Sequence, residues 1–144
     1  MAYSELLLIP MRQDLTRHGA VETRTTQAVD EMLAPGSGTV LMIVNSVCGC
    51  AAGKARPAVG MALTSETKPD KVATVFAGGD VEATEYLREK YLGEYPASSP
   101  SMAIFRDGKP VYYMHRRQIE SRGPGEIAAE LKTAFEQHCG VKSS

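Results

Sequence analysis

The chain has 144 residues, which is enough for one ordinary domain that buries a sizeable core without disulfide crosslinks. Its 16 basic and 17 acidic residues give a formal charge of -1 and are scattered along the sequence. This balance argues against nucleic acid or a charged membrane surface as a partner. We therefore expect one domain over residues 1–144.

The start of the chain lacks the pattern of a targeting segment. The stretch "MAYSELLLIPMRQDL" has only a short apolar run, with acidic residues on both sides and no basic leader. No apolar stretch approaches the roughly 20 residues that a membrane-spanning helix needs. We expect a soluble, cytoplasmic protein with no membrane partner.

The first elements in the chain are two short helices around a short strand. Proline suits a first helical turn and glycine suits an end, so residues 10–19 are predicted to form a helix. Residues 20–24 can form a strand, and Thr25 or Thr26 can cap the next helix. The apolar residues expected on one face of that helix are Val29, Met32 and Leu33.

Two apolar runs predict strands in the middle of a sheet. Residues 39–45 and 71–79 are rich in β-branched and aliphatic side chains, as is typical of strands buried on both faces. Between these runs, residues 51–63 favour a helix. Pro57 lies inside it, where it removes one hydrogen bond and crowds the carbonyl of Gly53, so we expect a kink.

The second half of the chain predicts a helix, a hairpin and a closing helix. A helix should follow Asp80, a residue that suits the N-cap position. Residues 100–116 contain two apolar runs joined by Asp107-Gly108, which is typical of a tight hairpin turn. The last helix is expected to begin near Pro124. Its apolar stripe consists of Ile127, Leu131, Ala134 and Phe135.

This order of elements predicts an α/β fold with a central mixed sheet. Strands that alternate with helices form parallel core pairs joined by right-handed crossovers, and the hairpin adds antiparallel strands at its C-terminal side. We expect helices on both faces and an extra helix at the N-terminus. In such sheets the chemistry gathers beyond the carboxyl ends of the central strands, where Cys48 and Cys50 follow residues 39–45.

The segment "NSVCGCAAG", residues 45–53, suits thiol chemistry. A loop that leaves a strand and enters a helix directs backbone N–H groups and the positive end of the helix dipole at Cys48. A helix N-terminus can lower a cysteine pKa from about 8.5 into the range of about 3.5–7.5, and the thiolate is the attacking species in disulfide exchange. Cys50 can then attack the mixed disulfide that Cys48 forms.

Three other interpretations of the pair remain open. The two cysteines can be inert core thiols, because free cysteine is among the most buried residue types. They can bind a soft ion such as Cu(I) through two thiolates. A zinc site needs four ligands, and the remaining candidates show no metal-binding spacing. Those candidates are Cys139, His18, His115 and His138.

Several segments together resemble a known family. A strand, a cysteine pair, a helix with a proline and, later, "SSPSMAIFRDGK" follow the order of the thioredoxin superfamily, in which a cis-proline loop faces the redox cysteines. Pro100 occupies that place, and cis peptides are nearly confined to X–Pro bonds. The segments "NSVCGCAAGKARPA", "TVFAGGDVEAT", "SSPSMA" and "AFEQHC" resemble the bacilliredoxin family, the CGC-bearing thioredoxin-like proteins, over nearly the whole chain.

The resemblance implies a role for each of five residues. Cys48 matches the nucleophile that takes the thiol adduct, and Cys50 matches the resolving or regenerating cysteine. Ser99 and Pro100 match the loop that holds a substrate strand by backbone hydrogen bonds. Cys139 matches a cysteine near the end of the family's chains, and its role is open between an inert residue and a partner for an adduct or an intermolecular disulfide.

The sequence therefore predicts a thioredoxin-like thiol–disulfide oxidoreductase. The resemblance implies removal of bacillithiol from client proteins, with bacillithiol as co-substrate and no resident cofactor or metal. A general disulfide isomerase or reductase and a non-enzymatic soft-metal carrier remain alternatives. Lys54 and Arg56 can attract a carboxylate-rich small thiol or can be solvated helix charges, and His115, next to two arginines, is interpreted as a surface or structural residue.

Overall fold

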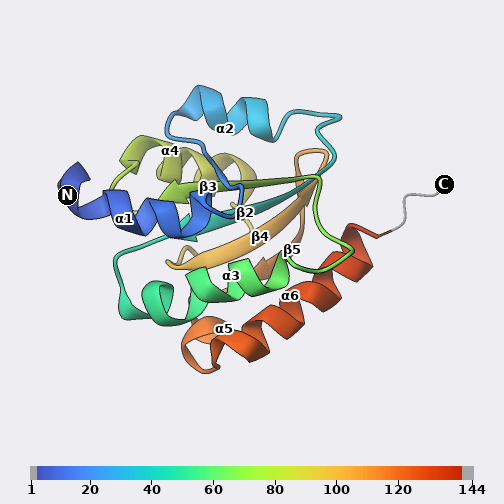
Figure 1. The fold of residues 1–144 in the computed structure, drawn as a ribbon. Helices are drawn as coiled ribbons and strands as arrows, with labels where there is room; N and C mark the ends of the chain where they lie inside the picture. Colours follow the sequence, from blue (N-terminus) through green and yellow to red (C-terminus); the bar gives the residue numbers. More distant parts are fainter. Residues whose placement is uncertain (1–2, 141–144) are drawn as a thin grey trace.

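A five-stranded sheet in the order β1-β3-β2-β4-β5 forms the centre of the computed structural model, which describes residues 3–140 (Figure 1). The strands β1, β3 and β2 are parallel, β4 is antiparallel to β2, and β5 is antiparallel to β4. The strands are β1 (Val21–Glu22), β2 (Thr39–Asn45), β3 (Lys71–Phe76), β4 (Ser101–Arg106) and β5 (Lys109–Met114).

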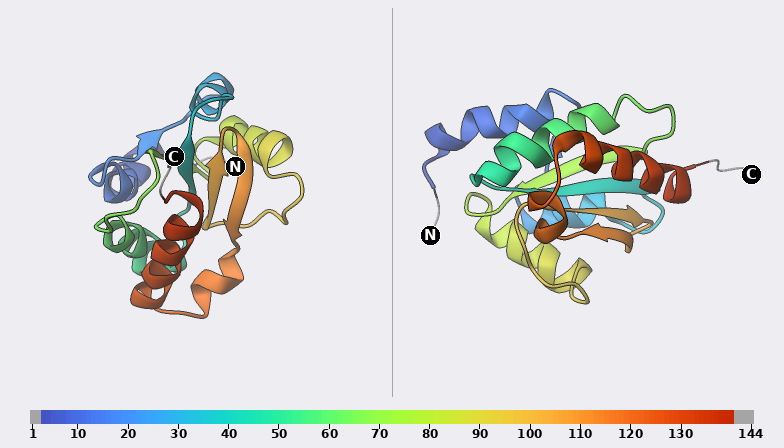
Figure 2. Two further views of the ribbon diagram at one scale, coloured as in Figure 1. Left: turned by 90° about the vertical axis from the view of Figure 1, so that its right-hand side faces the viewer. Right: turned by 90° about the horizontal axis from the view of Figure 1, so that it is seen from below.

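Helices cover both faces of this sheet (Figure 2). One face carries α1 (Glu5–Thr16), α3 (Arg56–Ala62), α5 (Arg116–Glu120) and α6 (Pro124–His138). The other face carries α2 (Thr26–Met32), α4 (Val81–Tyr86) and the π-helical segment η2 (Leu87–Tyr91). A second π-helical segment, η1 (Ala51–Ala55), leads into α3. Along residues 3–140, no helix has the length and apolar character needed to cross a bilayer.

The side chains of β2 alternate between the two faces of the sheet and so contribute to both halves of the core. Every residue of β2 is buried, as predicted for a central strand. Leu41 and Ile43 point to the face covered by α1, α3 and α6, whereas Val40, Met42 and Val44 point to the face covered by α2 and α4. The mixed sheet, the parallel core, the C-terminal hairpin and the N-terminal helix confirm the predicted fold class.

The hairpin and two caps also match the sequence interpretation. Asp107 and Gly108 have φ values of 51° and 85° and join β4 to β5 in a tight turn. The side chain of Thr25 accepts a hydrogen bond from Ala28 N and caps α2. Pro124 is in the first turn of α6, as its position indicated.

The start of the first helix was predicted wrongly. The helix α1 begins at Glu5 rather than at Pro10, and it continues through the proline. Pro10 is exposed, and its ring interrupts only one hydrogen bond to the preceding turn. The buried side chains of Leu8, Arg12 and Leu15 hold the helix on both sides of that position.

Two further elements differ from the prediction. The expected helix over residues 51–63 is divided into the π-helical η1 and the α-helical α3, and Arg56 N donates to Ala51 O at the junction. Pro57 lies in the first turn of α3, so its missing N–H falls where the hydrogen-bond pattern changes from π-helical to α-helical. The helix α5 was not predicted at all, since it has only five residues.

Candidate functional site

Three segments that are distant in the sequence meet at one end of the sheet. The strand register pairs Val44 with Ser101, so the loop after β2 lies beside the loop before β4. The register of the hairpin pairs Met102 with Met114, which brings the start of α5 to the same end. The CGC segment (residues 48–50), the Ser99-Pro100 loop and α5 are therefore neighbours.

The CGC segment is placed at the start of a helical stretch. Residues 49 and 50 already have helical geometry ahead of η1, so Cys48 flanks the first turn. Its sulfur accepts a hydrogen bond from Cys50 N at 3.2 Å, and its carbonyl accepts from Ala51 N at 3.0 Å. Cys48 and Cys50 are partly exposed thiols. Neither residue is fully buried, which argues against the alternative of inert core thiols.

The two sulfurs differ in their tendency to ionise. Burial opposes ionisation of Cys48. This effect is outweighed by hydrogen bonds to its sulfur from the backbone of Cys50 and Ala51 and from the Cys50 thiol, and by the positive charge of Arg116. The pKa of Cys48 is therefore lowered. Burial and the neighbouring Cys48 sulfur raise the pKa of Cys50. The loop thus favours a thiolate at Cys48 and a thiol at Cys50, as the loop position predicted for Cys48.

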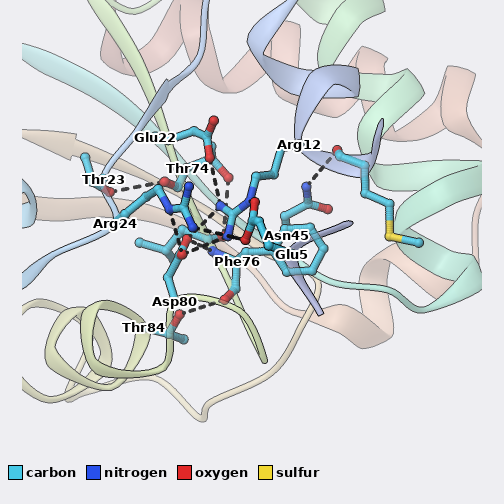
Figure 3. Close-up of polar contacts among 12 residues, drawn as sticks. Glu5, Arg12, Glu22, Thr23, Arg24, Asn45, Thr74, Phe76, Asp80 and Thr84 are labelled. Carbon is cyan, nitrogen blue, oxygen red and sulfur yellow. Dashed lines mark hydrogen bonds and ion pairs between the residues drawn. The ribbon is translucent and has the colours of Figure 1, made fainter. Parts of the chain in front are cut away.

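A chain of hydrogen bonds anchors the loop to α1. Cys48 N donates to Ser46 Oγ at 3.2 Å, and Ser46 N donates to Asn45 Oδ1 at 2.9 Å. Asn45 Nδ2 donates in turn to Met11 O in α1 at 3.2 Å (Figure 3). Asn45 and Ser46 therefore hold the loop that carries Cys48 against α1.

Two residues of α5 border the cysteines. Arg116 Nε donates to Glu120 Oε2 at 3.1 Å, and the same oxygen lies 3.8 Å from the Cys50 sulfur, which donates to it. Arg116 Nη1 also donates to Ser99 O at 3.3 Å. Glu120 was given no role from the sequence, and His115, which was interpreted as a surface or structural residue, caps the start of α5. The predicted hairpin could have indicated their position. Two antiparallel strands of equal length return the chain to the end of the sheet where the first strand begins, so the residues after β5 lie near the loop before β4.

The Ser99-Pro100 loop lies at the site with a cis peptide bond between the two residues. Pro100 is buried and Ser99 is partly exposed. Next to them, the side-chain oxygen of Ser98 accepts from Arg116 N at 3.2 Å. A substrate strand that pairs with the carbonyl of Ser99 would share that oxygen with Arg116, and this substrate role stays a prediction.

The charges of the CGC helix are engaged within the protein. Lys54 Nζ donates to Glu120 O at 2.5 Å, so it holds the end of α5 rather than extending into solvent. Arg56 is buried, donates to Met11 O at 3.2 Å and pairs with Asp14 at 3.3 Å. Arg56 is therefore not a solvated helix charge, and attraction of a small thiol by Lys54 or Arg56 stays a prediction.

Cys139 lies away from the redox pair. It is buried at the end of α6 and lines a depression together with Thr39 and Arg106. Thr39 begins β2 and Asn45 ends it, so the length of this strand, about 20 Å, separates Cys139 from the CGC segment. Cys139 cannot resolve an adduct on Cys48 within the same chain.

The described part of the chain contains no grouping of three or more His, Cys, Asp or Glu side chains that could hold a metal ion. The chemistry available at the site is that of two adjacent thiols, a carboxylate and a guanidinium.

Solved structures place the chain in a fold class. A variant thioredoxin from Halobacterium salinarum superposes with a TM-score of 0.60 at 16% identity, over 88% of this chain and 96% of the thioredoxin. A thioredoxin from Malassezia sympodialis superposes with a TM-score of 0.58, over 85% of this chain and 92% of the other. The protein therefore has the thioredoxin fold, and it carries a pair of cysteines after the central strand.

Sequence relatives identify the family within this class. The model of the family described as "Disulphide isomerase" matches residues 3–139. A protein named Bacilliredoxin from Koribacter versatilis is 49% identical over 139 residues, 96% of this chain and 95% of its own. Another with that name from Bacillus cereus is 49% identical over 138 residues, 95% of each chain. The chain belongs to the bacilliredoxin family and is a thiol–disulfide oxidoreductase.

Proposed function

We propose that the protein removes bacillithiol from mixed disulfides on client proteins. The observation that carries this proposal is the asymmetry of the CGC segment, in which backbone N–H groups favour the Cys48 thiolate while Cys50 keeps its proton. The name Bacilliredoxin, which full-length relatives carry, supports the choice of the small thiol. In this scheme bacillithiol is a substrate, and the two thiols act without a resident cofactor.

The first step is a thiol–disulfide exchange. The Cys48 thiolate attacks the bacillithiol sulfur of the mixed disulfide, a new S–S bond forms between them, and the client leaves as a thiolate that takes a proton from water. The client sulfur is reduced and Cys48 is oxidised. The number of disulfide bonds does not change, so this step needs no other oxidant or reductant.

The second step clears Cys48. Cys50 attacks the Cys48 sulfur, which releases bacillithiol and leaves a Cys48–Cys50 disulfide, or a second low-molecular-weight thiol takes the adduct directly. The 3.2 Å hydrogen bond from Cys50 N to the Cys48 sulfur places the two residues side by side. Cys139 has no part in this step because it lies at the other end of the sheet.

A test follows the adduct by mass spectrometry. A bacillithiolated client is incubated with the wild type and with the variants Cys50→Ser, Cys48→Ser and Cys139→Ala. We expect an adduct trapped on Cys48 in Cys50→Ser, an unchanged client with Cys48→Ser, and wild-type transfer with Cys139→Ala. A client that keeps its adduct in the presence of wild-type protein contradicts the proposal.

A second candidate function is disulfide isomerisation of proteins, which the description of the matching family favours. Cys48 and Cys50 are only partly buried, which suits a protein disulfide as well as a small adduct. Refolding of a scrambled disulfide substrate, compared with adduct removal under the same conditions, separates the two activities. Isomerisation without adduct removal would replace the first proposal with the second.

A further inference from the structure

The carboxylate of Glu120 is directed at the second cysteine. Its Oε2 accepts from the Cys50 sulfur at 3.8 Å, within the range of a weak hydrogen bond to sulfur. The same oxygen accepts from Arg116 Nε at 3.1 Å. The carboxylate therefore lies between the guanidinium and the thiol, and it touches a reacting atom.

The helix that carries Glu120 is fixed at both ends. At its start, Arg116 N donates to Ser98 Oγ at 3.2 Å, and the His115 side chain accepts from Arg117 N at 3.1 Å. At its end, Lys54 Nζ donates to the Glu120 carbonyl, which ties α5 to the helical segment that follows the cysteines. Ile119 is fully buried beneath the helix. Glu120 is exposed, but its backbone is held in place.

The resolving step requires the loss of a proton. Burial favours the neutral form of the Cys50 thiol, so its attack on an adduct needs an acceptor for the thiol proton. A general base must lie within hydrogen-bond reach of the proton that it takes, and contacts of this kind are often long before substrate binds. Among the described residues, Glu120 is the carboxylate that has this contact with Cys50.

We propose that Glu120 is the general base of the resolving step and that Arg116 positions it. This inference rests on the proposed function, because it takes Cys50 as the resolving cysteine. Cys50 attacks the Cys48 sulfur while its proton passes to Glu120 Oε2. The Cys48–Cys50 disulfide forms, the bond from Cys48 to the adduct breaks, and the adduct leaves as a thiolate. The leaving sulfur is reduced as Cys50 is oxidised.

Arg116 acts through other groups. It donates to Glu120 Oε2 and to Ser99 O, and so connects the base to the loop beside the cysteines. Its charge also lies close enough to Cys48 to favour the thiolate. Replacement of Arg116 should therefore affect both steps, whereas replacement of Glu120 should affect mainly the second.

The test uses dithiobis(nitrobenzoate), which reports the two steps separately and contains no bacillithiol. In the Cys139→Ala background, attack by Cys48 releases a first thionitrobenzoate at a rate that rises with reagent concentration. Attack by Cys50 releases a second one at a rate that does not depend on the reagent. Stopped-flow absorbance resolves the two phases for the parent, Glu120→Gln, Glu120→Asp and Arg116→Gln.

We expect Glu120→Gln to slow the second phase by about 100-fold, the low end for loss of a general base because the carboxylate is exposed, and to change the first phase by less than about twofold. The rate of the second phase should rise more steeply with pH in this variant, because hydroxide must take the Cys50 proton in place of Glu120. Glu120→Asp should recover part of the rate. The exposed carboxylate variant Glu136→Gln should match the parent in both phases.

A parent-like second phase in Glu120→Gln would overturn the inference. So would an equal slowing of both phases with an unchanged pH profile, because that result describes a structural role. The two proposals can also fail separately. If a client keeps its bacillithiol but the second phase depends on Glu120, bacillithiol is not the substrate, and Glu120 is still the general base for Cys50.

Discussion

At the scale of single residues, the two cysteines are made different by one turn of backbone. The sulfur of Cys48 faces the N–H groups of the turn that follows it, whereas Cys50 is already inside that turn and faces Glu120. Hydrogen bonds to the charged form lower a pKa, and a neighbouring negative charge raises one. The order of the two residues along the chain therefore sets which one attacks.

Asn45 supports this arrangement from below the loop. In Asn45→Ala, the buried Ser46 N loses its acceptor and a small cavity opens, so we expect a loss of about 1–3 kcal/mol in the free energy of unfolding. Urea denaturation measures it. The matched variant Ser46→Ala should lose less, because the hydrogen bond that it removes is only partly buried, whereas the bond from Ser46 N to Asn45 is buried. Equal stability of Asn45→Ala and the wild type would contradict the anchoring role.

The cysteines were predictable from the sequence, but their neighbours were not. Spacing and the preceding apolar run placed Cys48 and Cys50 at the carboxyl end of a central strand, and the structure agrees. Arg116 and Glu120 are about 70 residues further along the chain and reach the site only through the register of β4 and β5. A charged pair spaced by four residues is usually a solvated helix face, so its pattern alone gave no signal.

At the scale of elements, turn chemistry was the most reliable guide and helix boundaries the least. The Asp107-Gly108 turn was predicted because few other residue pairs tolerate positive φ at both positions. The start of α1 was missed because Pro10 is typical of a first turn, yet tertiary packing of Leu8 and Leu15 extends the helix past it. The π-helical η1 leaves no periodic signal in so short a segment.

Gly108 offers a test of the hairpin. Its φ of 85° disfavours a side chain, and an added Cβ would lie 2.4 Å from the carbonyl oxygen of Leu33. Gly108→Ala should therefore lower the free energy of unfolding by about 2 kcal/mol. Gly125→Ala is the control, because an added Cβ there meets no atom within 4 Å and alanine favours a helix. We expect a change between zero and a gain of about 1 kcal/mol for this control. Thermal and urea unfolding compare the pair, and equal effects would reject the steric argument.

At the scale of the whole molecule, a buried ion cluster ties α1 to the sheet. Arg12 reaches from α1 and pairs with Asp80 through two nitrogens at 2.9 and 3.0 Å, and also with Glu5 and Glu22 (Figure 3). Asp80 occupies the N-cap position of α4, as predicted, but its carboxylate bonds to Arg12 and to Phe76 N rather than to an N–H of the helix. Burial opposes the charge of Arg12, yet the hydrogen bonds to Asp80 and Glu5 raise its pKa.

Loss of this cluster should destabilise the entire fold. Arg12→Met removes the main partner of the buried Asp80, and we expect about 3–5 kcal/mol less stability in urea unfolding. Arg17→Gln is the control on the same helix, since its exposed pair with Asp14 is worth at most about 1 kcal/mol. A loss in Arg12→Met no larger than in the control would show that α1 is held by its apolar side chains alone.

The fold stabilises a thiolate at Cys48 and a thiol at Cys50. The most direct measurement is the initial rate of alkylation of each cysteine as a function of pH, with peptide mass spectrometry to assign the modified residue. An ordinary cysteine titrates at about 8.5. We expect the Cys48 rate to level off at a lower pH than this, while the Cys50 rate continues to rise above it. A common midpoint for the two residues, or the reverse order, would show that the loop does not stabilise a thiolate at Cys48.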